Sequence, residues 1–238
     1  LTNVIAVAAG YQGSLALRSD GMLYGWGWYD GTALFPSGLP SIDYTAWGWA
    51  HYLTLRPDGT LTAWSEENRY GEGGVPAISD VVAIAVGGYF NLALIADGTV
   101  VAWGWEEYVP DGVTNVVAIA AGNNHSLALK SDGTVVMWGW ANPEVAHMPS
   151  DLTNVVAIAS GGHGDHCLAL RVDGTVVAWG LNDFGQTNVP FGLTNVIGIA
   201  GGGRHSLALP GDASPTITVP PRSRRVTPGS SVAITALA

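Results

Sequence analysis

A repeat of about 40 residues runs through the chain and limits the folds that it can adopt. Versions of the segment T-N-V-V-A-I-A-A-G begin at six positions: Thr2, Ser41, Ser79, Thr114, Thr153 and Thr194. Self-similarity at a period of roughly 20 to 50 residues is typical of solenoids, propellers and other repeat arrays. The repeat is therefore the structural unit, and its internal pattern predicts the fold.

Each repeat contains three short stretches with the composition of β-strands. A stretch rich in Val, Ile and Ala precedes an L-x-L stretch such as Leu127–Leu129, and a third stretch ends at a Trp such as Trp138. An Asp-Gly pair separates the second stretch from the third, and glycine accepts the positive φ that a tight hairpin needs. These turns begin at Asp20, Asp58, Asp97, Asp132 and Asp173. Glycine and proline interrupt the pattern too often for a helical solenoid.

We therefore predict an all-β fold, a β-propeller of six to seven blades with a short C-terminal β segment. The sequence contains six first strands but five Trp-Gly third strands, because no such strand follows Leu209. About five and a half blades are encoded in this way, and closure of the ring is an open question. The chain begins inside a repeat, which suggests a piece of a longer protein.

The composition changes after the last L-x-L stretch, and this divides the chain. Residues 1–209 form the predicted propeller, and residues 210–215 are a linker of Pro, Gly, Asp, Ala and Ser. Residues 216–238 resemble the truncated start of an immunoglobulin-like domain. Alternatively, this segment adds a strand to the propeller, because an open blade edge has unpaired backbone groups.

The amino-acid sequence of the repeats resembles that of the repeats in the regulator of chromosome condensation family. The resemblance rests on NVVAIAAGNNHSLALKSDGTVVMWGW and covers roughly Thr2 to Leu209. The stretch VVAWGLNDFGQTNVPFGLTNVIGIAGGGRHSLAL, from Val176, is closer to a bacterial branch that includes the secreted beta-lactamase inhibitor protein II. The resemblance implies a propeller and a secreted or cell-surface bacterial location. It implies little about function, because one fold hosts many activities.

Charge and composition exclude several classes of function. Nine basic residues against 19 acidic ones give a net charge of −10, so a nucleic-acid partner is not expected. No apolar run reaches the ~18 residues that a membrane span requires. The single cysteine, Cys167, cannot form an internal disulfide. Nothing in the sequence indicates a cofactor.

Strand order decides which loops share a face. Neighbouring strands of a blade run antiparallel, so the loop between the first and second strands and the loop that leaves the third lie together. We call this side the upper face and the side of the Asp-Gly turns the lower face. The lower turns are nearly uniform, whereas the upper loops vary in length and carry many aromatic residues. The upper face is therefore the predicted binding face.

The tryptophans divide by their position in the repeat. Those that recur in register are expected in the core: Trp26, Trp64, Trp103, Trp138 and Trp179, with Trp47 in a first strand. Four others fall in upper loops and either anchor a partner or fold back over the blades. The predicted partner-binding residues are Trp28, Tyr29, Trp49, Tyr89, Phe90, Trp105, Glu106, Tyr108, Trp140 and Phe184. For most of these the resemblance to the inhibitor selects the same loops.

The leading hypothesis is a non-catalytic module that binds a protein through these aromatic and acidic loops. A carbohydrate-binding propeller could use the same rings as stacking platforms, and a beta-lactamase inhibitor is a further alternative. If the ring is open, its edges could also pair with another chain. No nucleophile with its base is recognisable, so an enzyme is not expected.

Histidines recur just before the L-x-L stretches, at His51, His125, His166 and His205. Repetition at one structural position favours a packing or hydrogen-bonding role. His163, Asp165 and His166 are close enough in sequence to serve as metal ligands, but this spacing arises easily by chance. They are weak candidates, and no metal is predicted.

Overall fold

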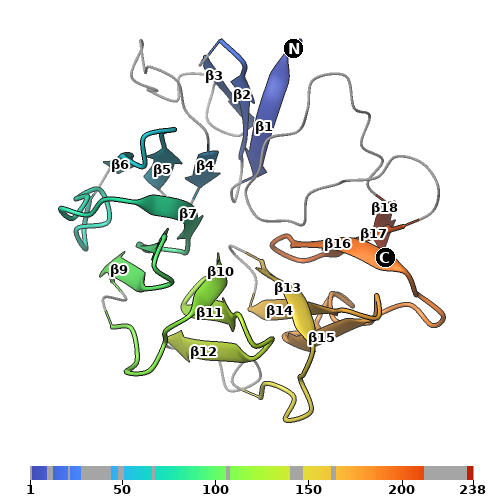
Figure 1. Ribbon diagram of the computed structural model, residues 1–238. Coiled ribbons are helices and arrows are strands. Elements are labelled where there is room, and N and C mark those ends of the chain that lie inside the picture. The colour runs from blue at the N-terminus through green and yellow to red at the C-terminus, as the bar shows by residue number, and fades with distance from the viewer. Residues whose placement is uncertain are drawn as a thin grey trace.

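The chain folds into six antiparallel sheets of three strands each (Figure 1). The computed structural model describes residues 2–9, 13–20, 22–27, 44–47, 51–65, 68–105, 108–139, 147–161, 165–211 and 235–237. The sheets follow one another around a centre, as the blades of a propeller do. The all-β propeller that the repeats predict is therefore confirmed. Within the described residues, no helix is long and apolar enough to cross a membrane.

The six blades follow the chain in order. Blades 1 to 3 consist of β1 (Val4–Ala9), β2 (Gly13–Arg18), β3 (Leu23–Gly27), β4 (Tyr44–Trp47), β5 (His51–Leu55), β6 (Leu61–Ser65), β7 (Val81–Val86), β8 (Phe90–Ile95) and β9 (Val100–Gly104). Blades 4 to 6 consist of β10 (Val116–Ala121), β11 (His125–Lys130), β12 (Val135–Gly139), β13 (Val155–Ser160), β14 (His166–Arg171), β15 (Val176–Gly180), β16 (Val196–Gly201), β17 (Ser206–Pro210) and β18 (Thr235–Leu237).

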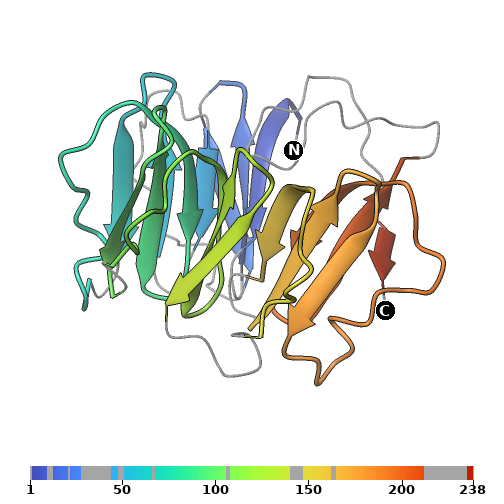
Figure 2. The same ribbon diagram turned by 60° about the horizontal axis from the view of Figure 1, so that its bottom comes forward.

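The first strand of each blade lies nearest the centre of the ring (Figure 1). β1, β4, β7, β10, β13 and β16 contact one another in that order. Within the described residues, the ring is not closed between blade 6 and blade 1 (Figure 1). Seen from the side, the strands run between two sets of loops (Figure 2), which are the upper and lower faces expected from strand order.

Blade 6 takes its third strand from the C-terminal tail. β18 pairs antiparallel with β17, so that Leu237 lies opposite Ser206 in the register. The sequence pattern contains five third strands, and the structure adds this sixth one. Residues 212–234, which connect β17 to β18, lie outside the described part of the chain.

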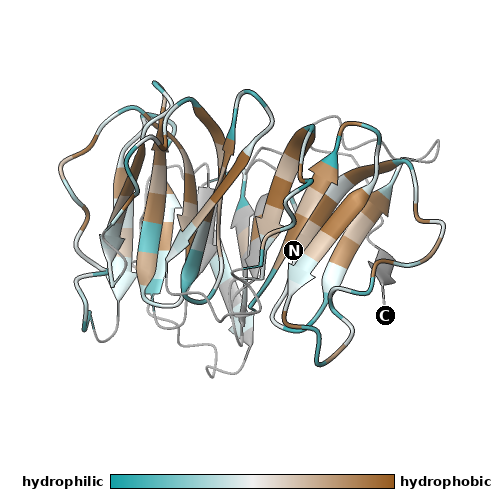
Figure 3. Ribbon diagram, turned by 90° about the horizontal axis from the view of Figure 1, so that it is seen from below, coloured by the Kyte–Doolittle hydropathy of each residue, from teal (hydrophilic) through white to brown (hydrophobic). Residues whose placement is uncertain are grey.

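The core consists of a series of similar seams between consecutive blades. Between blades 2 and 3, Leu53 and Leu55 of β5 pack in one cluster with Ile84 and Trp103 of blade 3. Corresponding clusters join blades 3 and 4 and blades 4 and 5. Figure 3 shows the hydrophobic colour concentrated on the strands and the hydrophilic colour on the loops. Fully burying one such leucine contributes on the order of 2 kcal/mol.

The fixed register of the third strand brings its Trp into each seam. Ser126 is paired with Trp138, and Cys167 with Trp179. Each of these tryptophans is buried against the leucines of the preceding blade. The prediction that Trp103, Trp138 and Trp179 belong to the core is thus confirmed, whereas Trp64 is half-buried and the side chain of Trp47 lies outside the description.

Trp26 departs from this rule, and its prediction as a core residue is wrong. Its side chain is 50% exposed, against 6% for Trp103 at the same register position. Val7, which corresponds to the buried Ile84, is also largely exposed. Trp103, Trp138 and Trp179 are buried against the blade before their own, whereas no blade lies on that side of blade 1 among the described residues.

The recurring histidines lie at the upper ends of the seams. His51 Nε2 is 3.2 Å from Asn91 Oδ1 of blade 3, and His125 Nε2 is 3.1 Å from Cys167 Sγ of blade 5. The rings of His51, His125 and His166 are fully buried, which confirms the packing role. His205 is exposed, in contrast to this expectation, and no further blade covers it among the described residues.

Burial also changes the protonation of these histidines. Burial, and to a smaller extent the neighbouring His166, lowers the pKa of His125 to about 4. Burial lowers the pKa of His51 and His166 as well. Burial of an imidazole disfavours its charged form, so these rings are neutral at pH 7. The adjacent Cys167 thiol has its pKa raised by burial to about 12 and is unreactive at that pH.

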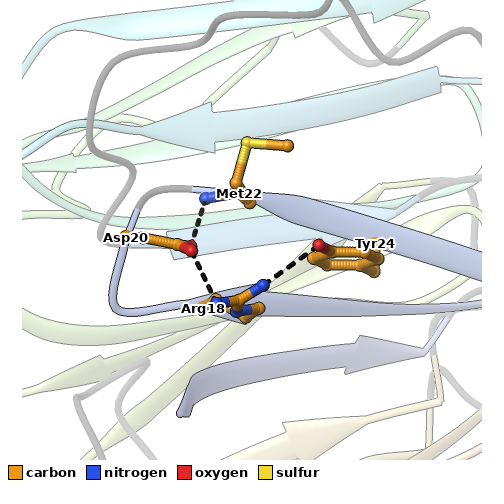
Figure 4. A network of polar contacts seen from close by, with 4 residues as sticks. All are labelled: Arg18, Asp20, Met22 and Tyr24. Atoms are coloured by element: carbon orange, nitrogen blue, oxygen red, sulfur yellow. Dashed lines mark hydrogen bonds and ion pairs between the residues drawn. The ribbon is translucent and has the colours of Figure 1, made fainter. Parts of the chain in front are cut away.

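The Asp-Gly turns form the lower face, where each aspartate stabilises its own hairpin. Asp132 accepts hydrogen bonds from the backbone N and from Oγ1 of Thr134, and the hydroxyl holds the pKa of Asp132 below its usual value. In blade 1 Met22 replaces the threonine. Figure 4 shows the alternative contacts, in which Asp20 accepts from Met22 N and pairs with Arg18 at 2.7 Å. Arg18 also donates to Tyr24 Oη.

The lower turns also join neighbouring blades. Val116 N, at the start of blade 4, donates to Gly98 O in the Asp-Gly turn of blade 3, at 3.0 Å. The preceding Asn115 has a φ of 57°, a left-handed conformation that asparagine tolerates. Its carbonyl accepts from Ser131 N. The uniform sequence of the T-N-V and D-G segments thus has a structural cause, and the lower face is the framework of the ring.

Seam burial predicts unequal costs for removing two tryptophans from the same register position. Trp138→Ala should lower the free energy of unfolding by about 3 to 5 kcal/mol, because it leaves a cavity between blades 3 and 4. Trp26→Ala should cost about 1 kcal/mol or less, because its ring is half exposed. Urea denaturation followed by circular dichroism measures both. Equal losses would contradict the seam model.

The buried imidazoles predict a loss of stability in acid. The unfolded chain protonates His125 below its usual pKa of 6.5, whereas the folded chain does so only near 4. Stability from this residue is therefore complete above pH 6.5 and decreases as the pH falls to about 4, by on the order of 3 kcal/mol. His125→Phe should flatten the pH dependence of the urea midpoint in this window, and an unchanged slope would refute the assignment. Phenylalanine is a matched replacement, since Phe90 occupies this position in blade 3.

Candidate functional site

Two upper loops, in blades 2 and 5, form the same turn. In blade 2, Asn68 Oδ1 accepts from Gly73 N, and Glu72 Oε2 accepts from Tyr70 N at 2.8 Å. In blade 5, Asn182 Oδ1 accepts from Thr187 N, and Gln186 Oε1 accepts from Phe184 N at 2.9 Å. The blade 5 turn has the sequence N-D-F-G-Q, and N-R-Y-G-E in blade 2 is its structural equivalent.

The glycine of this turn is required by its backbone. Gly71 and Gly185 have φ values of 82° and 79°, in the left-handed region that favours glycine. The residue before the glycine is aromatic in both loops. It contributes its backbone N, and not its side chain, to the hydrogen bonds that form the turn. Tyr70 is 41% exposed and Phe184 60%. The turn therefore presents one ring to solvent on a defined backbone.

Glu72 anchors the blade 2 turn in the protein interior. Its carboxylate accepts from Ser65 Oγ as well as from backbone, and its own carbonyl accepts from Asn91 Nδ2 and Trp103 Nε1 of blade 3. Burial alone raises the pKa of Glu72, but donated hydrogen bonds and nearby His51 hold it below its usual value. The buried carboxylate is therefore ionised and structural.

Tyr70 belongs to a cluster of three aromatic rings at the seam between blades 2 and 3. Its ring lies edge-on to Tyr89 at 5.3 Å between centroids and 5.9 Å from Trp105. Tyr89 comes from the loop between β7 and β8, and Trp105 follows β9, where its backbone N donates to Tyr89 O. Trp105 is 38% exposed. Edge-to-face packing of this kind restricts the rings while leaving part of each in solvent.

A second aromatic group lies at the corresponding seam between blades 5 and 6. The guanidinium carbon of Arg204 is 4.5 Å from the centroid of the Phe184 ring. Arg204 comes from the loop between β16 and β17, which corresponds to the loop that contributes Tyr89 in blade 3. An exposed cation–π contact of this kind contributes about 0.5 to 1 kcal/mol. Both groups thus combine the ring of one blade's exit turn with the next blade's upper loop.

The predicted binding residues divide into three sets. Tyr89, Trp105, Tyr108 and Phe184 lie in the upper loops, and Tyr108 is 66% exposed. Five fall outside the described residues: Trp28, Tyr29, Trp49, Glu106 and Trp140. The last, Phe90, was placed on the face incorrectly. It is the first residue of β8 and is fully buried, because it stands where the other seams hold histidine.

Tyr70 and Arg204 were not among the binding residues predicted from the sequence. The signal for Tyr70 was the alignment of N-R-Y-G-E with N-D-F-G-Q, which puts Tyr70 in register with Phe184. For Arg204, no pattern in the sequence indicated a contact with Phe184, because 20 residues separate them and their proximity depends on packing of blade 6 against blade 5.

The weak metal candidates are divided by the structure. Asp165 is half-buried and burial raises the pKa of its carboxyl, while His166 is fully buried in the seam. His163 lies outside the described residues. Among the residues that the structure describes, no three His, Cys, Asp or Glu side chains are grouped to hold a metal ion.

Comparisons with known proteins address the repeat. The sequence model of the regulator of chromosome condensation (RCC1) repeat matches residues 4–30, 81–108, 116–142 and 155–186. The ultraviolet-B receptor UVR8 of Arabidopsis thaliana is 29% identical over 136 residues, which are 46% of this chain and 31% of the receptor. The match thus spans about a third of that relative.

Solved structures of similar shape support the fold. The ectodomain of the Physcomitrella patens receptor kinase CR4 has a TM-score of 0.72 at 22% identity, over 88% of this chain and 62% of that one. Prp20p of Saccharomyces cerevisiae has a TM-score of 0.71 at 21% identity, over 87% and 70%. Yeast RCC1 (Prp20) bound to Kap60 has 0.69 at 22% identity, over 87% and 68%. The four matched segments are therefore RCC1-type repeats, and the shared shapes support the β-propeller fold.

Proposed function

We propose that the chain is a non-catalytic protein-binding module that holds its partner with the aromatic and acidic loops of the upper face. One observation supports this most directly. Tyr70 and Phe184 project from the same hydrogen-bonded turn in two blades, and each packs against the next blade's upper loop. Partly exposed Tyr, Trp and Phe on a rigid support are typical anchors of protein interfaces.

Charge indicates what kind of protein surface fits this face. The chain has a net charge of −10, and Glu106 follows Trp105 directly in the sequence. An acidic surface with exposed rings favours a partner that presents arginine or lysine, because such charges pair with carboxylates and stack on aromatic faces. Arg204 over Phe184 illustrates this contact within the chain itself.

Relatives of the same fold support a protein partner. One solved relative is yeast RCC1 (Prp20) in complex with Kap60, and another structure concerns the binding of Prp20p to Gsp1p and histones. These partners belong to those proteins. They support the proposal for this chain because they show that a propeller of similar shape can bind other proteins.

Carbohydrate binding is the second candidate, favoured by the partly exposed flat rings of Tyr70 and Trp105. A sugar face packs on such a ring, and binding would change tryptophan fluorescence. A secreted or cell-surface location is part of the proposal and is tested by fractionating the source cells. Inhibition of a beta-lactamase is tested by a direct enzyme assay with micromolar chain.

The proposal predicts that removing single rings from the upper face weakens binding without unfolding the chain. Affinity capture from the source organism with the native chain identifies a partner, and isothermal titration calorimetry measures its dissociation constant. Trp105→Ala and Phe184→Ala should each weaken binding at least tenfold, about 1.4 kcal/mol, because partly exposed anchors lose their contact area. The circular dichroism spectrum should not change.

Met22→Ala and Val172→Ala are the matched controls, since both side chains are apolar, exposed and next to lower turns. They should leave the dissociation constant unchanged. The proposal fails if the ring variants bind the captured protein as tightly as the native chain. The alternative is supported by a different pair of outcomes. If no protein is captured, and oligosaccharides change the tryptophan fluorescence of the native chain but not that of Trp105→Ala, the chain binds carbohydrate.

A further inference from the structure

One position on the upper face changes its chemistry from blade to blade. It directly precedes the position of the recurring histidines, and in blades 3 to 6 it holds an aromatic residue, an amide, an acid and a base: Tyr89, Asn124, Asp165 and Arg204. Each of these residues is at least partly exposed. Their side chains can therefore differ without a change in the core.

The backbone at this position is held in a similar way in successive blades. In blade 6, Gly202 N closes the loop by donating to His205 O at 2.9 Å, and the same bond recurs in blades 3 to 5. The exit of the third strand fixes the position from the other side, since Leu181 N donates to Asp165 O at 2.7 Å. A Cβ on Gly180, whose φ is 101°, would lie 2.5 Å from this same oxygen. A variable side chain is thus presented by a defined backbone.

Blades 5 and 6 place an acid and a base in neighbouring upper loops. Gly161 and Gly201, at the upper ends of the inner strands, form a parallel bridge between the two blades. No ion pair joins Asp165 to Arg204, and neither forms an ion pair with another residue that the structure describes. Two opposite charges are thus available on adjacent blades.

Each of the two charges is in a state that favours a partner group. Asp165 is half-buried, and burial raises the pKa of its carboxyl. A cation placed beside this carboxylate would stabilise its charged form. The guanidinium of Arg204 lies over the ring of Phe184. A stacked guanidinium retains the N–H donors in its plane, which can bind a carboxylate through two hydrogen bonds.

We propose that Asp165 and Arg204 form a paired-charge site that binds one extended segment of a protein partner. Asp165 takes a lysine or arginine of this segment, and Arg204 takes a glutamate or aspartate. Side chains two residues apart in an extended segment project to the same side, so one segment can present both charges. The inference rests on the proposed function and adds the chemistry of the partner to it.

A short peptide tests the site directly. Acetyl-Gly-Lys-Gly-Glu-Gly-amide is titrated into the full chain labelled with nitrogen-15, and the amide of Asp165 and the Nε–H of Arg204 are followed by nuclear magnetic resonance. The neutral control peptide has glutamine in place of both charged residues. We expect the charged peptide to bind about fivefold more tightly, because exposed ion pairs are individually weak. Equal affinities, or no binding of the charged peptide at millimolar concentration, would overturn the proposal.

Double-mutant cycles assign each charge of the peptide to its residue. Asp165→Asn should remove the contribution of the peptide lysine and keep that of the glutamate, and Arg204→Gln should do the reverse. Asparagine is a compatible replacement, since Asn124 occupies this position in blade 4. A lysine contribution that survives Asp165→Asn would overturn the assignment.

Asp58→Asn and Arg56→Gln are the matched controls, because they change the net charge by the same amounts near the lower turn of blade 2. They should leave both contributions unchanged. Losses as large as those of the upper-face variants would assign the binding to net charge and overturn the site.

The captured partner separates this inference from the proposed function. If Trp105→Ala weakens its binding while Asp165→Asn and Arg204→Gln do not, the proposed function stands and the paired-charge site is overturned. If the two charge variants weaken binding and Trp105→Ala does not, the site is supported and the aromatic anchor fails. Where no protein is captured, the peptide titration still decides the inference.

Discussion

The contact between the second-strand leucines of one blade and the third-strand tryptophan of the next supports the rest of this propeller. Each blade alone is a three-stranded sheet with apolar side chains on both faces, and it buries them only against neighbours. The Asp-Gly turns add backbone hydrogen bonds between blades at the lower face. Stability is therefore shared between neighbours, and Val7 and Trp26 of blade 1 are exposed although the corresponding Ile84 and Trp103 of blade 3 are buried.

Variation at the upper end of each seam shows how the repeat tolerates change. The position that holds His51, His125 and His166 holds Phe90 in blade 3, and all four side chains are buried. His51 and His125 have hydrogen-bond partners in the next blade, Asn91 and Ser160, that a phenyl ring cannot use, whereas neither ring nitrogen of His166 has a partner among the described residues. Ser126, the residue of blade 4 that corresponds to Asn91, accordingly has a buried hydroxyl without a partner among the described residues. Packing fixes the size of this side chain more strictly than its polarity.

The sequence predicted the parts of the structure that depend on local pattern. The strand positions, the Asp-Gly turns and the burial of Trp103 follow from the spacing of residues within the repeat, because equivalent residues in neighbouring blades pack in the same way. Trp26 and Phe90 were misplaced for opposite reasons. The exposure of Trp26 depends on a missing neighbour, which no residue within its own repeat records. Phe90 differs in type from its histidine equivalents, and its position in the register, rather than its aromatic character, decided its burial.

The candidate binding face cannot be separated from the seams below it. Glu72 O holds Trp103 in the core through its indole N–H, and the same residue's carboxylate fixes the backbone N of Tyr70. Tyr70 therefore reaches solvent from a turn that the seam itself positions, as Phe184 does above Gln186. A ring held in this way loses little conformational entropy on binding, which is an advantage for an interface anchor. At the seam between blades 5 and 6, the donor to Gln186 O among the described residues is Ser206 Oγ, whereas Glu72 O accepts both from Asn91 Nδ2 and from the indole of Trp103, so the two upper turns are tied to their seams by different side chains.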